Sequence, residues 1–162
     1  MDHQAFAQLL GNYGELIGAI GVVITLAYLV VQIRHNTRAT RAASHHAITD
    51  SLNVGNIAQA QDAELARIFM SGCEDRSSLS DVERQRFDML MLSYFHVMDS
   101  LFYSAKVGAG ELGLLQAEEP GLVYLISRSG VGQWWDENPY GLSAAFRQYV
   151  DDLRTGRSST QR

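Results

Sequence analysis

The sequence predicts an all-α protein in which one N-terminal transmembrane helix continues into a stalk helix and a small cytoplasmic helical bundle follows. Three observations support this class. Residues 16–33 form the uncharged run LIGAIGVVITLAYLVVQI. The chain has 162 residues but only two prolines, and residue types that favour helix are common in it. After position 80, apolar residues recur at the spacing of a helical stripe.

The uncharged run has the length of a membrane span. An α-helix rises about 1.5 Å per residue, so about eighteen to twenty residues cross a hydrocarbon core of roughly 30 Å. Arg34, Arg38 and Arg41 follow the run, whereas the segment before it contains no lysine or arginine. The positive-inside rule therefore places the residues after the span in the cytoplasm, with the three arginines at the membrane surface and the N-terminus outside.

Two other interpretations of the run compete with a membrane span. A cleaved signal peptide begins with a basic segment and ends at a small-residue cleavage site. This chain begins Met1-Asp2-His3-Gln4, and its run ends in VVQIR, so a signal peptide is disfavoured. The core helix of a water-soluble domain stays open as an alternative, because the eighteen residues of the run lie at the short end of the range for a span.

One face of the predicted span carries small and weakly polar residues at alternating steps of three and four. These residues are Gly11, Gly14, Gly18, Gly21, Thr25, Tyr28 and Gln32. Small residues let helix backbones approach each other in lipid, where the hydrophobic effect gives little drive for association. The stripe therefore predicts contact with another transmembrane helix, from a second copy or a larger complex. A glycine-rich span without a partner is the alternative.

Composition divides the chain into six segments. They are a short external N-terminus (1–15), the transmembrane helix (16–33), a membrane-proximal helix (34–72), a loop (73–79), a helical domain (80–154) and a disordered tail (155–162). Ser80 and Glu83 have the spacing of a capping box, which predicts a long helix from there to about Val107. A glycine-rich link and a helix over 114–127 that contains Pro120 are expected next.

Two adjacent tryptophans, Trp134 and Trp135, are expected on a short helix over 133–136, after a break at residues 130–132. Neighbouring side chains on one short helix point in different directions. We therefore expect one ring in the core and the other nearer the surface, as a core or partner anchor. Ser143 is expected to cap a last helix that runs through Leu153.

Three stretches carry a resemblance: VVITLAYLVVQIRHNTRATRA at the end of the span, SLSDVERQRFDMLMLSYFHVMDSLFY in the long helix, and WWDEN with FRQYVDDL after a glycine-rich turn. In this order they resemble an uncharacterised group of bacterial single-pass membrane proteins. The resemblance covers most of residues 14–153 and implies an anchored helical domain. We expect the chain in the bacterial inner (cytoplasmic) membrane. It carries over no catalytic residue. At Glu111-Leu112-Gly113 the acidic, Trp-containing helix start of the group is missing, so a shorter helix is expected there.

The sequence contains few groups that suggest chemistry. A net charge of −5 argues against nucleic-acid binding, which requires a basic face. Cys73 is the only cysteine and is interpreted as structural. The five histidines include no Glu-x-x-His pair, and the G-x-G-x-x-G match at 108–113 has no preceding strand, so no metal and no cofactor is predicted.

The leading functional hypothesis is a non-enzymatic accessory or scaffold subunit of a larger membrane complex, or a homo-oligomer, with membrane lipid and another transmembrane helix as partners. The first alternative is a membrane-tethered sensor or small-ligand-binding module, with a pocket between the long helix and the Trp134 segment. The second is a membrane-tethered enzyme that uses His96, Asp99 and Tyr103.

Overall fold

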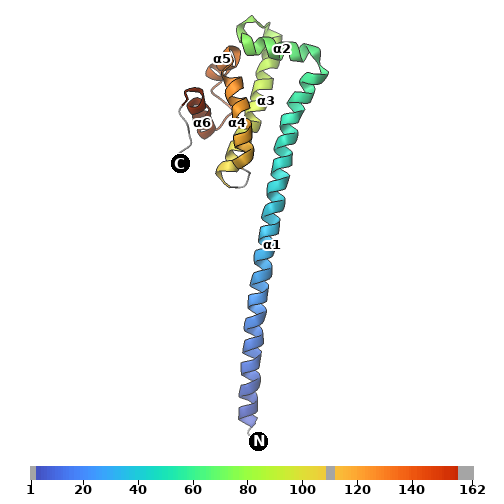
Figure 1. The fold of residues 1–162 in the computed structure, drawn as a ribbon, viewed down its shortest axis with the longest axis vertical. Helices are drawn as coiled ribbons and strands as arrows, with labels where there is room; N and C mark the ends of the chain where they lie inside the picture. Colours follow the sequence, from blue (N-terminus) through green and yellow to red (C-terminus); the bar gives the residue numbers. More distant parts are fainter. Residues whose placement is uncertain (1–2, 109–111, 157–162) are drawn as a thin grey trace. The chain divides into compact units, whose positions relative to one another are not determined.

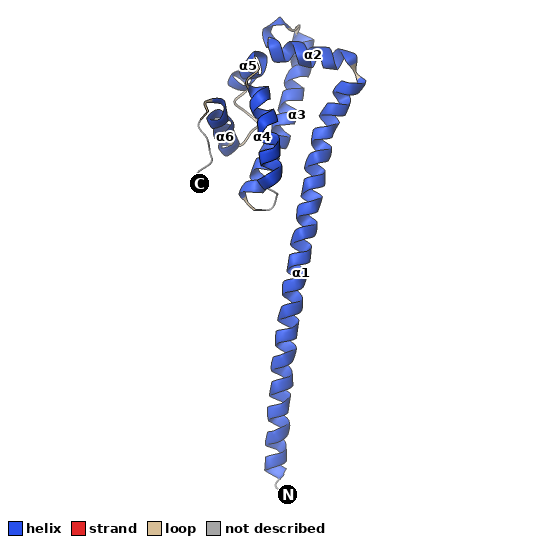
Figure 2. Ribbon diagram, viewed as in Figure 1, coloured by secondary structure: helices blue, strands red, loops and turns tan. Residues whose placement is uncertain are grey.

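The computed structural model describes residues 3–108 and 112–156, with the side chains of 3–12 and of Leu16 outside the description. Every regular element in this part of the chain is a helix (Figures 1 and 2), which confirms the predicted fold class. The elements are α1 (His3–Gln61), α2 (Ala63–Glu74), the short 3-10 helix η1 (Arg76–Ser78), α3 (Asp81–Lys106), α4 (Leu112–Ile126), α5 (Ser129–Glu137) and α6 (Ala144–Arg154). The chain divides into two compact units, Met1–Thr40 and Arg41–Arg162.

The N-terminal unit consists of the first part of α1. This helix is long and apolar enough to cross a membrane, with a mean hydropathy of 2.4 over its most apolar window. No residue of that window is buried against other parts of the protein. The apolar side chains of the unit, from Ile17 to Ile33, are therefore available to another apolar environment.

The prediction of a single helix over 34–72 is wrong, because the helix is interrupted at Asp62, between α1 and α2. The backbone of Asp62 is extended, and its carboxylate accepts hydrogen bonds from the amides of Glu64 and Leu65 at 2.9 and 3.0 Å. An aspartate that caps a new helix in this way satisfies amides that would otherwise lack partners. The predicted loop at 73–79 likewise contains the end of α2 and the 3-10 helix η1.

The long helix α3 begins and ends within one residue of its predicted bounds. Its capping box is present, since Ser80 and Glu83 each bond the backbone amide of the other. Glu83 also pairs with Arg67 of α2, and these bonds lower the pKa of its carboxyl to about 2. The predicted apolar stripe faces the core, where the fully covered side chains are Phe87, Met91, Phe95, Met98 and Leu101.

The centre of the core is an aromatic cluster, and here the prediction for the tryptophans is wrong. Trp134 and Trp135 are both only 1% exposed. The ring of Phe95 stacks on Trp134 at 5.2 Å and lies 4.9 Å from Trp135, measured between centroids. Trp135 also donates from Nε1 to Asp151 of α6 at 2.8 Å. Both rings are covered because α5 packs between neighbours, with α3 on one side and α6 on another.

The predicted break at 130–132 is also wrong, because α5 already begins at Ser129. Its glycines serve a close contact between helices instead. A Cβ atom on Gly130 would lie 1.8 Å from the carbonyl oxygen of Gly72, and one on Gly72 would lie 2.4 Å from the ring of Phe87. Only the missing side chains allow α2, α3 and α5 to approach this closely.

We therefore expect Gly130→Ala to destabilise the C-terminal unit by about 3 kcal/mol, since an added methyl must push two backbones apart. Thermal unfolding followed by circular dichroism measures this. Gly121→Ala in α4 is the control, because a Cβ there meets nothing within 4 Å. It should leave stability unchanged or raise it by up to about 1 kcal/mol. Equal unfolding temperatures for the two variants would contradict the close contact.

Candidate functional site

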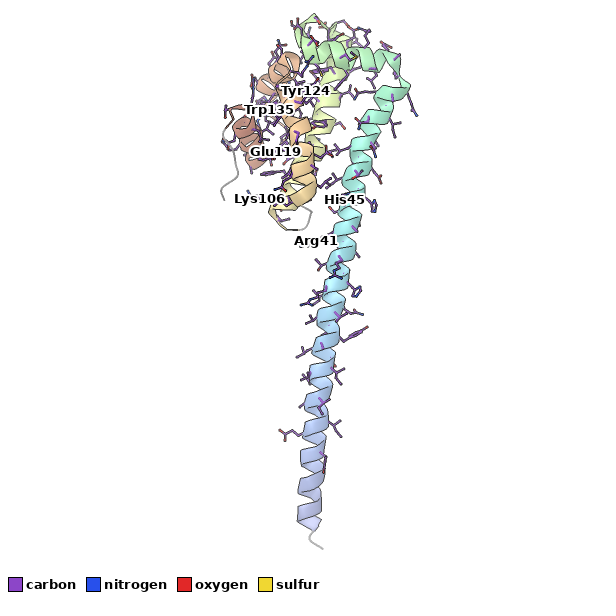
Figure 3. All side chains as sticks on the ribbon, in the orientation of Figure 1. Arg41, His45, Lys106, Glu119, Tyr124 and Trp135 are labelled. Atoms are coloured by element: carbon purple, nitrogen blue, oxygen red, sulfur yellow. The ribbon has the colours of Figure 1, made fainter. Side chains whose placement is uncertain are left out.

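A cavity lies within the C-terminal unit, and we call it the α1–α4 groove. Its volume is about 550 Å³, and its walls come from α1, α2, α3 and α4. The apolar part of the lining includes Leu52, Phe69, Met70, Leu90, Met91, Val97 and Leu125. Two tyrosines, Tyr94 of α3 and Tyr124 of α4, add aromatic surface (Figure 3 labels Tyr124). The groove therefore combines a hydrophobic floor with polar groups, as small-ligand sites do.

The sequence of α1 explains why this space is left open. Ile48 is buried and Leu52 is half-buried, so they supply the apolar contacts of the last turns of α1. The residues beside them that line the groove are polar, among them Asn53 and Asn56. These polar side chains pack poorly against the apolar residues that form the floor of the groove. At the far end of α3, Arg41 donates from Nη2 to the carbonyl oxygen of Gly108 at 3.2 Å.

Three charged residues line the groove, and two of them neutralise each other. Arg128 forms an ion pair with Glu74, and its guanidinium lies 5.9 Å from the ring centroid of Tyr124. Glu118 forms no salt bridge with any described residue. Burial raises the pKa of Tyr94 to about 12, and the nearby negative charge of Glu118 contributes to the rise. Glu118 is thus the one carboxylate of the lining that has no salt-bridge partner among the described residues.

Cys73 also lines the groove, at its α2 wall. Its side chain is 5% exposed, and burial raises the pKa of the thiol to about 11, despite the opposing effect of Arg128. The thiol is therefore neutral near pH 7 and packs as an apolar group, which agrees with its interpretation as structural.

A smaller cavity of about 400 Å³ lies where the sequence predicted a pocket, between the long helix and the Trp134 segment. Its lining includes Arg84, Asp88 and Tyr140. Asp88 is already held by Arg76 through two hydrogen bonds of 2.7 Å. The larger groove lies against α1, α2 and α4, and the sequence offered no signal for it because its walls come from four separate helices.

The residues of the enzyme alternative are engaged in structural contacts. Nε2 of His96 lies 2.8 Å from the carbonyl oxygen of Gly141. The carboxylate of Asp99 accepts from the backbone amide of Ser143 at 2.7 Å and from its hydroxyl at 2.6 Å. Tyr103 is 62% exposed. His96 and Asp99 therefore hold the loop before α6 against α3. The predicted N-terminal cap of α6 by Ser143 is confirmed. Among the described residues, no group of three His, Cys, Asp or Glu could hold a metal ion.

The predicted helix-contact stripe lies on the N-terminal part of α1. A Cβ atom on Gly14, Gly18 or Gly21 would meet nothing within 4 Å, and the side-chain position of Gly11 lies outside the described residues. The polar members bond within the helix: Thr25 donates to the carbonyl oxygen of Gly21 at 2.8 Å, and Gln32 donates to the hydroxyl of Tyr28 at 2.6 Å. Each of these three side chains therefore has one hydrogen bond within the helix.

The membrane-surface arginines fall in both units. Arg34 and Arg38 are exposed on the N-terminal unit, whereas Arg41 belongs to the C-terminal unit and bonds Gly108. The tryptophans, predicted as a core or partner anchor, both serve the core. Residues 109–111, which include part of the G-x-G-x-x-G match, and residues 157–162 of the predicted tail lie outside the described residues.

The described residues define an all-helical protein with one apolar N-terminal helix and a C-terminal unit that contains a groove. Comparisons with protein-family models, with curated proteins and with solved structures found no match.

We expect the thiol of Cys73 to react with iodoacetamide about 100-fold more slowly in the folded protein than after denaturation at pH 8. The thiolate is the reactive form, and raising the pKa from 9.0 to about 11 lowers its population by that factor. Mass spectrometry of timed samples, with and without guanidinium chloride, measures both rates. Equal rates would show that the thiol is accessible and ionised in the folded state.

Proposed function

We propose that this chain is a membrane-anchored, non-enzymatic helical protein, held in the bacterial inner membrane by the apolar part of α1. The observation that carries the proposal is that no residue of the apolar window in α1 is buried. A helix that is apolar all round and uncovered by its own chain requires an apolar surrounding. Lipid supplies this surrounding, and a helix satisfies all its backbone hydrogen bonds internally, as lipid requires.

The size of the apolar surface favours a bilayer over water. Ten aliphatic side chains in the span are between 46% and 68% exposed: Ile17, Ile20, Val22, Val23, Ile24, Leu26, Leu29, Val30, Val31 and Ile33. Burying such a side chain contributes about 1.5–3 kcal/mol, so the set contributes on the order of 10 kcal/mol or more. The proposed orientation follows from Arg34 and Arg38, which would remain on the cytoplasmic side with the C-terminal unit.

The proposed anchor is tested by flotation of membranes on a density gradient after alkaline carbonate washing. The wild-type chain is expected to float with lipid, whereas a double variant, Ile20→Arg with Ile24→Arg, should lose most of this association because charges at the centre of a span are costly. The matched control is Val54→Arg with Ile57→Arg, two exposed positions of α1 beyond the apolar run. Recovery of the wild-type chain in a detergent-free high-speed supernatant would overturn the proposal.

We further propose that the stripe on α1 contacts another transmembrane helix, so that the chain acts as an accessory or scaffold subunit of a larger membrane complex or forms a homo-oligomer. The open space around Gly14, Gly18 and Gly21 supports a selective test, because a Cβ atom added there meets nothing within 4 Å. Any effect of such side chains would then arise at a contact with another molecule.

The triple variant Gly14→Leu, Gly18→Leu and Gly21→Leu should reduce the size of the complex extracted in mild detergent, measured by blue native electrophoresis. Larger side chains would keep the two backbones apart. Ile17→Leu with Ile24→Leu, on the other face of the helix, is the control and should leave the size unchanged. A triple variant that migrates like the wild-type chain would count against the contact.

A further inference from the structure

The α1–α4 groove has the dimensions and lining of a small-molecule site. Its volume of about 550 Å³ lies within the usual range of roughly 300–1,000 Å³ for ligand pockets. The side chains that form its floor, including Phe69, Leu90 and Leu125, are only partly buried, so the chain leaves their apolar surface incompletely covered. A ligand with an apolar body would complete this packing.

The charges of the groove favour a positive ligand. Arg128 is its only cationic residue among the lining side chains, and it is already paired with Glu74. Glu118 has no such partner among the described residues. An anion in the groove would face this carboxylate without an available cation, whereas a cation would gain an ion pair in a partly desolvated setting.

The aromatic residues favour the same choice. A ring face attracts a cation within about 6 Å of its centroid, and most strongly where water is excluded. The ring of Tyr124 already lies 5.9 Å from the Arg128 guanidinium, so this ring takes part in such a contact. Tyr94 lines the same groove, and the negative charge of Glu118 contributes to the raised pKa of its hydroxyl. Carboxylate and aromatic surface therefore occur together.

We propose that the α1–α4 groove binds an organic cation with an apolar body, such as a quaternary ammonium or phosphonium compound. The apolar floor takes the body, while Glu118 and the tyrosine rings take the charge. Asn53, Asn56 and Gln59 on the α1 wall offer amide oxygens to the same ligand. The groove lies wholly in the C-terminal unit, so failure of the membrane experiments would leave this site unaffected.

The test uses the full chain in a non-ionic detergent and two probes of similar shape but opposite charge, tetraphenylphosphonium and tetraphenylborate. Isothermal titration calorimetry measures binding, and a titration into detergent alone corrects for partition. We expect saturable binding of the phosphonium and none of the borate. Glu118→Gln should weaken phosphonium binding about 10-fold, which equals about 1.4 kcal/mol.

Glu119→Gln is the matched control, because Glu119 is the next residue of α4 but accepts a hydrogen bond from the Tyr149 hydroxyl at 2.8 Å instead of lining the groove. It should bind the phosphonium like the wild-type chain. If Glu118→Gln fails to fold, Tyr124→Leu replaces it, since Tyr124 is 65% exposed and lies outside the core. This variant should also bind several-fold more weakly.

Three results would overturn the proposal: no saturable binding of the phosphonium, tighter binding of the borate, or equal phosphonium affinity in the wild-type chain and Glu118→Gln. The last result would place the probe in detergent or at another apolar surface. Weakened binding in Glu118→Gln together with unchanged binding in Glu119→Gln would support it, because a general loss of charge affects both variants alike.

Discussion

The C-terminal unit depends on the close approach of α2 and α5 at Gly72 and Gly130. Because no side chain separates the two helices there, α5 comes near enough to α3 for Trp134 to stack on Phe95. Trp135 then reaches α6, where its ring nitrogen bonds Asp151 and its face receives Arg147 at 4.3 Å. One backbone contact thus sets the positions of three helices.

The groove is a consequence of this arrangement. Five large aromatic residues gather where α3 meets α5 and α6: Phe95, Phe102, Trp134, Trp135 and Phe146. The side of α3 toward α4 and the last turns of α1 receives smaller and more polar neighbours. Ile48 is the only residue of α1 in the buried core among the described residues. Polar residues on the α1 wall leave an open space here, whereas aromatic rings fill the core on the other side of α3.

Local chemistry explains which elements could be predicted. The capping patterns at Ser80 and Ser143 involve residues three positions apart, so they can be read directly from the chain. Asp62 caps α2 by the same chemistry, but it lies within a continuous helical pattern, and its carboxylate also contacts Arg86 of α3. Both tryptophans are buried, against the prediction, because a short helix covered on several sides buries faces that an isolated helix exposes. For the groove, Tyr94, Glu118 and Arg128 are far apart in the sequence, so no spacing connects them.

By itself, the sequence determined the helical class, the uncharged segment long enough for a span, and the starts of α3 and α6, because each depends on the chemistry of neighbouring residues. Only the tertiary structure decided that α1 ends at Gln61, that both tryptophans are buried, and that Glu118 lines a groove with no salt-bridge partner among the described residues. These properties depend on which helices pack together. The close packing of α2 and α5 requires Gly72 and Gly130, whose role can be recognised only when the opposing backbone is known.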